Sequence, residues 1–221
     1  MAKILALDTA TEACSAALLC GPDVIERFEA LPRGHAGRIL GMLEEVLAEA
    51  GLTVSELDAI AFCRGPGAFT GVRIACGVVQ GIAYGAELPV VPLSTLAVLA
   101  QGALREHGAQ RVLAAIDARM GEVYVGEYRA VDGLMTLQGD EIVAAAEALA
   151  PMAGESWLGV GTGWAVHGEA LRARLGAPMA AYDALPRARD CLPLAVAALA
   201  QGQTVSAFEA VPVYLRDKVT N

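Results

Sequence analysis

The sequence predicts an α/β protein built from two lobes, each a mixed sheet with flanking helices. Strand-like runs alternate with amphipathic helical runs along the whole chain, which is typical of α/β proteins. The same order of elements, three strands followed by helices and further strands, occurs twice. Each round opens with a strand that ends at an aspartate, Asp8 in the first and Asp117 in the second. We therefore interpret the two halves as an internal duplication.

In the first round, hydrophobic runs bounded by turn residues indicate the strands, and longer runs with apolar residues three and four apart indicate the helices. The predicted strands are residues 3–7, 13–20, 24–31, 57–63 and 88–91. The predicted helices are residues 35–50, 68–86 and 94–106. Gly51 is a natural C-cap for the first helix, and Ser94 is a natural N-cap for the third.

The second round is weaker. Its predicted strands are residues 111–116, 122–129, 134–137 and 157–160, and its predicted helices are residues 141–150, 164–175 and 192–200. We expect lobes of residues 1–106 and 107–221, the second one smaller, with the last helix free to pack back on the first lobe. The duplicated order resembles the ribonuclease-H-like halves of the actin-like ATPase superfamily, a likeness of fold that does not define function.

The composition limits the partners that this chain can bind alone. Its 221 residues carry a net charge of −9, which argues against a broad electrostatic footprint on nucleic acid. The N-terminal run lacks the features of a signal peptide, and no apolar segment reaches the roughly 18 residues expected of a membrane helix. The five scattered cysteines, with no Cys-x-x-Cys pair, predict reduced thiols in a cytoplasmic protein.

Residues 64–86 read RGPGAFTGVRIACGVVQGIAYGA, in which a Gly-Pro-Gly turn opens a helix rich in glycine. Each glycine inside a helix costs roughly 1 kcal/mol relative to alanine, so Gly71, Gly77 and Gly81 together cost about 3 kcal/mol. The four-residue spacing of Gly77, Gly81 and Gly85 makes a smooth ridge where another backbone can lie close. Three explanations are open: close packing within the domain, a helix–helix contact with another subunit, or packing on a ligand.

This stretch resembles a segment shared by the bacterial TsaB (YeaZ) family and its paralogue TsaD. Family members typically read GPGSFTGLRIG where this chain reads GPGAFTGVRIA, and the opening DTATEACSAAL and closing PVYLRDKV are also similar. The resemblance implies a non-catalytic scaffold subunit that works with TsaD and the ATPase TsaE in the cytoplasm. That complex forms N6-threonylcarbamoyladenosine at adenosine-37 of tRNAs that read codons beginning with A. Such a subunit would form a homodimer when alone and would reach tRNA only through the complex.

The ridge and the resemblance together place the expected interface, with a TsaD-like protein or a second copy, on helices 35–50 and 68–86. The candidate residues are His35, Ile39, Arg64, Phe69, Thr70, Arg73, Gly77 and Gly81. The planar forks of Arg64 and Arg73 suit carboxylate or phosphate contacts, and solvent exposure or a structural salt bridge is the alternative. Phe69 has the position of an apolar staple at the helix start.

In the actin-like superfamily, two aspartate-containing turns bind phosphates and a metal ion, and small residues let backbone N–H groups approach the phosphates. Here the first turn reads DTAT, without glycine, and the second carries the bulky Arg119 and Met120. Gly159, Gly161 and Gly163 form a G-x-G-x-G run that could border an adenine, but the run lacks the full dinucleotide-binding pattern. ATP or ADP is therefore expected only at an interface of the complex. The remnants of a nucleotide site are Asp8, Thr9, Asp117 and Gly161.

We expect no catalytic residue, no metal and no cofactor of the chain's own. TsaD-like proteins carry a His-x-x-x-His metal pair, and the corresponding positions here are Thr95 and Leu99, which cannot bind a metal as a pair. No serine lies in a Gly-x-Ser-x-Gly elbow, which argues against proteolysis. The competing hypothesis is an autonomous actin-like ATP-dependent phosphotransferase or ATPase.

Overall fold

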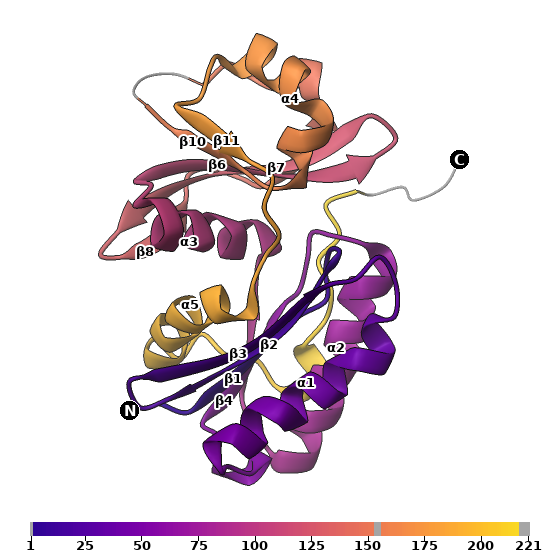
Figure 1. Ribbon diagram of the computed structural model, residues 1–221, viewed down its shortest axis with the longest axis vertical. Helices are drawn as coiled ribbons and strands as arrows, with labels where there is room; N and C mark the ends of the chain where they lie inside the picture. The colour runs from indigo at the N-terminus through magenta and orange to yellow at the C-terminus, as the bar shows by residue number, and fades with distance from the viewer. Residues whose placement is uncertain (1, 153–155, 217–221) are drawn as a thin grey trace. The chain divides into compact units, whose positions relative to one another are not determined.

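The structure is a computed structural model that describes residues 2–152 and 156–216. The chain separates into two compact units (Figure 1), one formed by Met1–Val98 with Pro186–Val213 and the other by Leu99–Leu185 with Tyr214–Asn221. Each unit has its own mixed β-sheet, so the predicted α/β class is confirmed. The end of the closing motif, residues 217–219, lies outside the described residues.

The sheet of the first unit has the strand order β3-β2-β1-β4-β5. Strands β1 (Ile4–Asp8), β2 (Ala13–Cys20) and β3 (Asp23–Ala30) pair antiparallel, and β4 (Ala59–Cys63) and β5 (Val90–Leu93) add in parallel. Short turns can join the antiparallel strands, whereas the parallel strands need helical crossover connections. The result is a ribonuclease-H-like unit, as predicted.

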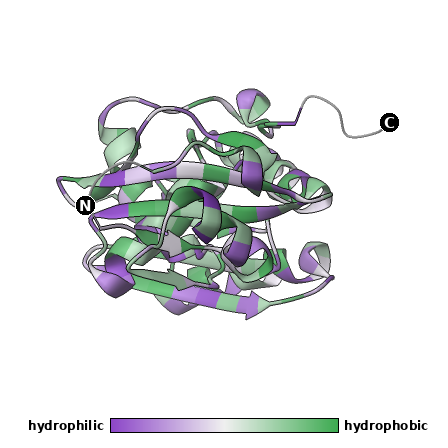
Figure 2. Ribbon diagram, turned by 90° about the horizontal axis from the view of Figure 1, so that it is seen from above, coloured by the Kyte–Doolittle hydropathy of each residue, from purple (hydrophilic) through white to green (hydrophobic). Residues whose placement is uncertain are grey.

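Helices α1 (His35–Ala50) and α2 (Phe69–Ala86) cover one face of this sheet, and α5 (Ala188–Ala200) covers the other (Figure 1). Alternate side chains of β1 point to opposite faces, so Leu7 packs in the core beneath α1 and α2 and Ala6 in the core beneath α5. The helical ribbons carry both hydrophobic and hydrophilic residues (Figure 2), as expected of helices with one buried face. Within the described part of the chain, no helix combines the length and apolarity needed to cross a membrane.

The sheet of the second unit has the order β11-β10-β6-β7-β8, and β9 also pairs with β7. Its strands are β6 (Arg111–Arg119), β7 (Glu122–Val131), β8 (Leu134–Leu137), β9 (Ile142–Ala145), β10 (Leu158–Val160) and β11 (Ala180–Tyr182). Helix α4 (Thr162–Leu175) packs against β6, where the buried Trp164 donates a hydrogen bond from its indole Nε1 to the Leu113 carbonyl at 3.2 Å. That bond satisfies the polar atom of an otherwise apolar side chain.

The helix predicted over residues 141–150 is wrong. This stretch forms β9 and a short 3-10 turn, Ala146–Ala148, named η2 in chain order. Alanine favours a helix through local propensity, but Val143 pairs with Tyr124 in the antiparallel ladder with β7, and tertiary pairing overrides propensity. Strand β11 was not predicted either, because two of its three residues are alanines, which are depleted in strands.

The division between the units differs from the predicted boundary at residues 106 and 107. Helix α3 (Thr95–His107) contributes to both units, because Gln101 bonds the Gly133 carbonyl at 3.1 Å and the Met135 N–H at 2.9 Å. Helix α5 belongs to the first unit, where its Leu192 is buried in the core. The first unit is therefore discontinuous in sequence.

Candidate functional site

The start of α2 packs directly against the turn that follows β1. The Ala68 N–H donates to the Ala10 carbonyl at 2.6 Å, and the Thr9 hydroxyl donates to the Gly71 carbonyl at 2.7 Å. A Cβ on Gly71 would lie 2.0 Å from the Thr9 oxygen, and one on Gly67 would lie 2.2 Å from the Ala10 oxygen. No other residue type fits at either position, so the close backbone approach in this glycine-rich stretch occurs at Gly67 and Gly71.

This packing closes the first aspartate turn. Asp8 and Thr9 are fully buried, and the Asp8 Oδ1 accepts a hydrogen bond from the Ala10 N–H at 3.1 Å. An amide that a phosphate would use is therefore already engaged. Burial raises the pKa of Asp8 to about 7, and its Oδ2 has no hydrogen-bond partner among the described residues.

The second aspartate turn is closed by its own side chains. The Asp117 carboxylate accepts a hydrogen bond from the Arg119 N–H at 3.0 Å, pairs with the Arg119 guanidinium at 3.0 Å, and lies 3.1 Å from His167 Nε2. Arg119 and Met120 both have left-handed backbones, with φ of 62° and 56°. The carboxylate is thus occupied by groups of its own unit. Sequence reasoning missed the contact with His167, because 50 residues separate the two and no local pattern links them.

The glycine run after β10 is explained by packing. A Cβ on Gly161 would lie 2.3 Å from the Ala115 carbonyl oxygen, and one on Gly163 would lie 2.9 Å from the Ala115 Cβ. A Cβ on Gly159 would lie 2.5 Å from the Trp164 ring. These glycines let β10 and the start of α4 lie close to β6, so Gly161 faces its own chain where the sequence suggested the border of an adenine.

Farther along α2, the glycines form an exposed stripe that the described chain leaves uncovered. Gly77, Gly81 and Gly85 are exposed, and a Cβ built on any of them meets no atom within 4 Å outside its own helical turns. Close packing within the domain is therefore wrong as the explanation of this ridge. Tyr84 and Phe208 extend the same surface as an exposed aromatic pair, with ring centroids 5.4 Å apart. We call Gly77, Gly81, Gly85, Tyr84 and Phe208 the α2 face.

The aromatic pair could not be predicted, because Phe208 follows Tyr84 by more than a hundred residues. Phe208 lies in the 3-10 turn Ala207–Glu209, which packs on α2. The Gln80 amide anchors this segment by donating to the Ala210 carbonyl at 3.1 Å. The two rings remain 67% and 75% exposed, so the pair presents a large apolar area to solvent.

The candidates on α1 divide into one core residue and one residue at the helix start. Ile39 is fully buried in the core, so it cannot contact a partner and its assignment to the interface is wrong. Its neighbour Leu40 is 50% exposed, because one helical step rotates a side chain by about 100°. His35 is half-buried, and its Nε2 is buried without a hydrogen-bond partner among the described residues.

The remaining candidates lie around the start of α2. Phe69, Thr70 and Arg73 are exposed there, and the Arg73 guanidinium carbon stands 3.4 Å from the centroid of the Phe69 ring. Arg73 also donates to the Phe69 carbonyl at 3.2 Å. The two residues therefore stabilise each other through a cation–π contact, and a partner would meet them as one unit. Arg64 is half-buried, and its backbone carbonyl accepts a hydrogen bond from the Val213 N–H at 2.9 Å.

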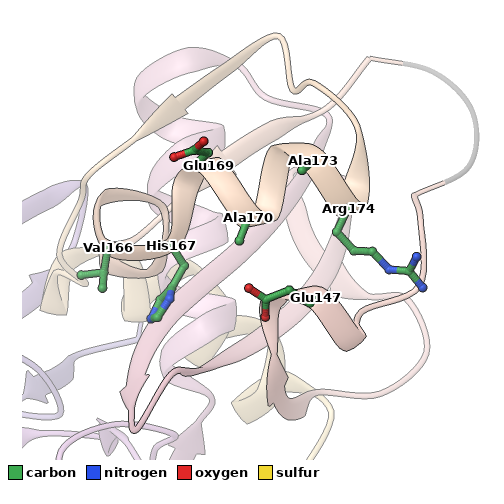
Figure 3. A pocket seen from close by; sticks show the side chains of 7 residues that line it. All are labelled: Glu147, Val166, His167, Glu169, Ala170, Ala173 and Arg174. Atoms are coloured by element: carbon green, nitrogen blue, oxygen red, sulfur yellow. The ribbon is translucent and has the colours of Figure 1, made fainter.

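A pocket of about 550 Å³ lies on the second unit between α4 and the 3-10 turn before β10 (Figure 3). Its lining residues are Glu147, Val166, His167, Glu169, Ala170, Ala173 and Arg174. The lining holds no hydroxyl or thiol, so it offers no serine, threonine or cysteine nucleophile. His167 contacts Asp117 through Nε2, at a position where the backbone of α4 departs from helical geometry.

Among the residues that the structure describes, no group of three or more His, Cys, Asp or Glu side chains is arranged to hold a metal ion. Thr95 and Leu99, which stand where a TsaD-like protein has its histidine pair, are both buried in α3. A buried hydroxyl and a buried isobutyl group make no metal ligand set.

The two ribonuclease-H-like units define a protein of the actin-like superfamily. In both units, the aspartate near the end of the first strand is engaged by groups of the chain itself. Comparisons with known proteins narrow the class. The family described as "TsaD: tRNA N6-adenosine threonylcarbamoyltransferase" matches residues 29–221. The "tRNA threonylcarbamoyladenosine biosynthesis protein TsaB" of Escherichia coli K12 is 47% identical, over 98% of this chain and 96% of that protein. Its namesake in Haemophilus influenzae is 44% identical, over 98% of this chain and 94% of that protein.

A solved structure, "YeaZ from Pseudomonas aeruginosa", is 52% identical and superimposes with a TM-score of 0.93, covering 97% of this chain and 100% of that one. The chain belongs to the TsaB (YeaZ) family.

Proposed function

We propose that this protein is a non-catalytic scaffold subunit in the synthesis of N6-threonylcarbamoyladenosine at adenosine-37 of tRNAs that read codons beginning with A. Its partners would be a TsaD-like transferase and a TsaE-like ATPase in the cytoplasm. The names of its full-length relatives support the pathway. The match to the TsaD family supports a shared fold with the transferase, and paralogous folds can pair through equivalent helices.

The observation that carries the scaffold role is the uncovered α2 face. Glycines that cost helix stability persist where no part of the described chain needs their small size. The segment from residue 74 to residue 86 contains no charged side chain, so another helix can cover it without burying an unpaired charge. The same face would pair two copies when the transferase is absent, because a two-fold axis can bring like surfaces together.

The closed aspartate turns support the absence of catalysis in this chain. Asp8 is buried and Asp117 is occupied by Arg119 and His167, so neither carboxylate stands ready for a nucleotide-bound metal ion. ATP or ADP would bind only at an interface of the complex. The net charge of −9 favours contact with tRNA through partners that supply basic surface.

The α2 face can be tested with Gly81→Leu. A leucine at this position meets no atom of the described chain, so the variant should fold with a thermal midpoint at or above that of the wild type. Binding to the TsaD-like protein from the same organism should weaken by at least about tenfold, since 1.4 kcal/mol of overpacking is one decade. Ala165→Leu, which adds similar bulk to the exposed side of α4, is the control and should bind normally. Unchanged binding by Gly81→Leu would remove the basis of the proposal.

The rival function, an autonomous ATP phosphotransferase or ATPase, is tested separately. Isothermal titration of the purified chain with ATP and magnesium should show no tight binding, and the chain alone should hydrolyse no ATP. Turnover that persists through further purification would favour the rival.

A further inference from the structure

Two cysteines that are far apart in the sequence meet inside the first unit. Cys63 is the last residue of β4, Cys191 lies in the first turn of α5, and both are fully buried. Their sulfur atoms are 3.7 Å apart, although 128 residues separate them along the chain. A disulfide brings the sulfurs to about 2.05 Å, so bond formation requires rotation of these two contacting side chains toward each other.

The other thiols are not placed in this way. Cys14 and Cys76 are buried, Cys20 is half-buried, and none of the three has a sulfur partner in the described part of the chain. The pairing of Cys63 with Cys191 is therefore specific to the native packing of α5 on the sheet.

A third group completes the cluster. The register of β1 against β4 places Asp8 beside Cys63, and the two groups interact electrostatically. One oxygen of the Asp8 carboxyl has no hydrogen-bond partner among the described residues. Because burial raises the pKa of Asp8 to about 7, its ionised and neutral forms are both accessible near neutral pH, as a proton acceptor requires.

We propose that Cys63 and Cys191 form a modification site, at which a hydroperoxide oxidises the two thiols to a disulfide that ties α5 to β4. One thiol attacks hydrogen peroxide, which breaks the O–O bond and leaves a sulfenic acid and one water. The second thiol attacks the sulfenic sulfur, which forms the S–S bond and releases a second water. Two thiols are oxidised and one peroxide is reduced, with Asp8 accepting the Cys63 proton and returning it to the departing hydroxide.

Burial decides which oxidant can act. It raises the pKa of Cys63 well above the ordinary value, so the side chain remains a thiol and reacts slowly. A water-sized peroxide can enter through local opening of the chain, whereas a bulky disulfide reagent would need α5 to leave the sheet. The bond would hold residues 186–200 on the sheet of the first unit, and this consequence does not depend on the proposed function.

The test is thiol counting on the folded, full-length chain. After incubation with hydrogen peroxide and removal of the excess, the protein is denatured in the presence of N-ethylmaleimide, and its mass is measured by mass spectrometry to count the alkylated thiols. We expect two fewer alkylated thiols than the five of the reduced chain, and peptide mapping should join Cys63 to Cys191. Dithiothreitol should restore all five. Five alkylated thiols after peroxide, or a bond that involves Cys14, Cys20 or Cys76, would overturn the proposal.

Variants and stability complete the design. Cys191→Ala and Cys63→Ala should each abolish the loss of two thiols, and Cys76→Ala should retain it as the matched control. The oxidised wild type should melt about 5 °C or more above the reduced protein, because the bond restricts the unfolded chain. A lower melting temperature after the Cys63–Cys191 bond forms would show that the native packing does not accept it, and would also overturn the proposal.

Discussion

The buried Asp8 carboxyl predicts how the free energy of unfolding depends on pH. In the unfolded chain this group titrates near its ordinary pKa of 3.8, whereas in the folded chain burial raises the pKa to about 7. Between these two values the folded chain holds more protons than the unfolded chain, so the free energy of unfolding falls as the pH rises. The loss is complete above the folded pKa, and at 1.36 kcal/mol per pKa unit it amounts to about 4 kcal/mol.

Asp8→Asn removes this titration. The asparagine keeps a side-chain oxygen that can accept the Ala10 N–H, and it carries no charge at any pH. The unpartnered amide donors would cost about 1–3 kcal/mol, but that cost is the same at every pH. Relative to the wild type, the variant should therefore gain about 4 kcal/mol of unfolding free energy between pH 4 and pH 8.

The assay is urea unfolding followed by circular dichroism at several pH values across this range. The quantity of interest is the difference in the free energy of unfolding between variant and wild type, in which the titration of all other groups cancels. Asp183→Asn changes an exposed carboxyl and serves as the control. Its difference from the wild type in unfolding free energy should not change with pH. If the Asp8→Asn and wild-type curves run parallel, burial does not hold this carboxyl neutral and the reasoning is wrong.

Two further predictions concern stability. Gly71→Ala places a methyl group 2.0 Å from the Thr9 oxygen, so it should lose about 3 kcal/mol or more by thermal unfolding, whereas Gly77→Ala, which meets nothing, should gain up to about 1 kcal/mol. Equal effects of the two would contradict the contrast between the closed and exposed parts of α2. Ser94→Ala removes the hydroxyl that caps α3 and should cost about 1 kcal/mol, measured by urea unfolding with Ser55→Ala as an exposed control. A loss no larger than that of the control would show that the cap is dispensable.

Local sequence determined the elements whose signals lie within a few residues. The apolar face of residues 35–50 and the glycine that follows them predicted α1 with its observed bounds, and Gly51 adopts a left-handed φ of 65°, which is common at helix ends. The order of strands and helices predicted two ribonuclease-H-like units, and the Gly-Pro-Gly segment indicated the TsaB family. These features depend on periodicity, capping and turn chemistry, which each stretch of chain carries by itself.

Tertiary structure decided everything that depends on which distant residues meet. The spacing of the glycines in α2 could not separate Gly71, pressed against a neighbouring turn, from Gly81, which nothing covers. Within the alanine-rich stretch 141–150, residues 142–145 form strand β9 because they pair with β7, against the local preference of the stretch for a helix. The Asp117 carboxylate contacts His167, which is 50 residues away in the sequence, and the Cys63 sulfur contacts that of Cys191, which is 128 residues away. A local sequence pattern reflects the preference of each residue for a backbone conformation, whereas a contact between distant residues depends on how the whole chain folds. Only the folded structure could therefore show which glycines are uncovered and which buried groups are paired.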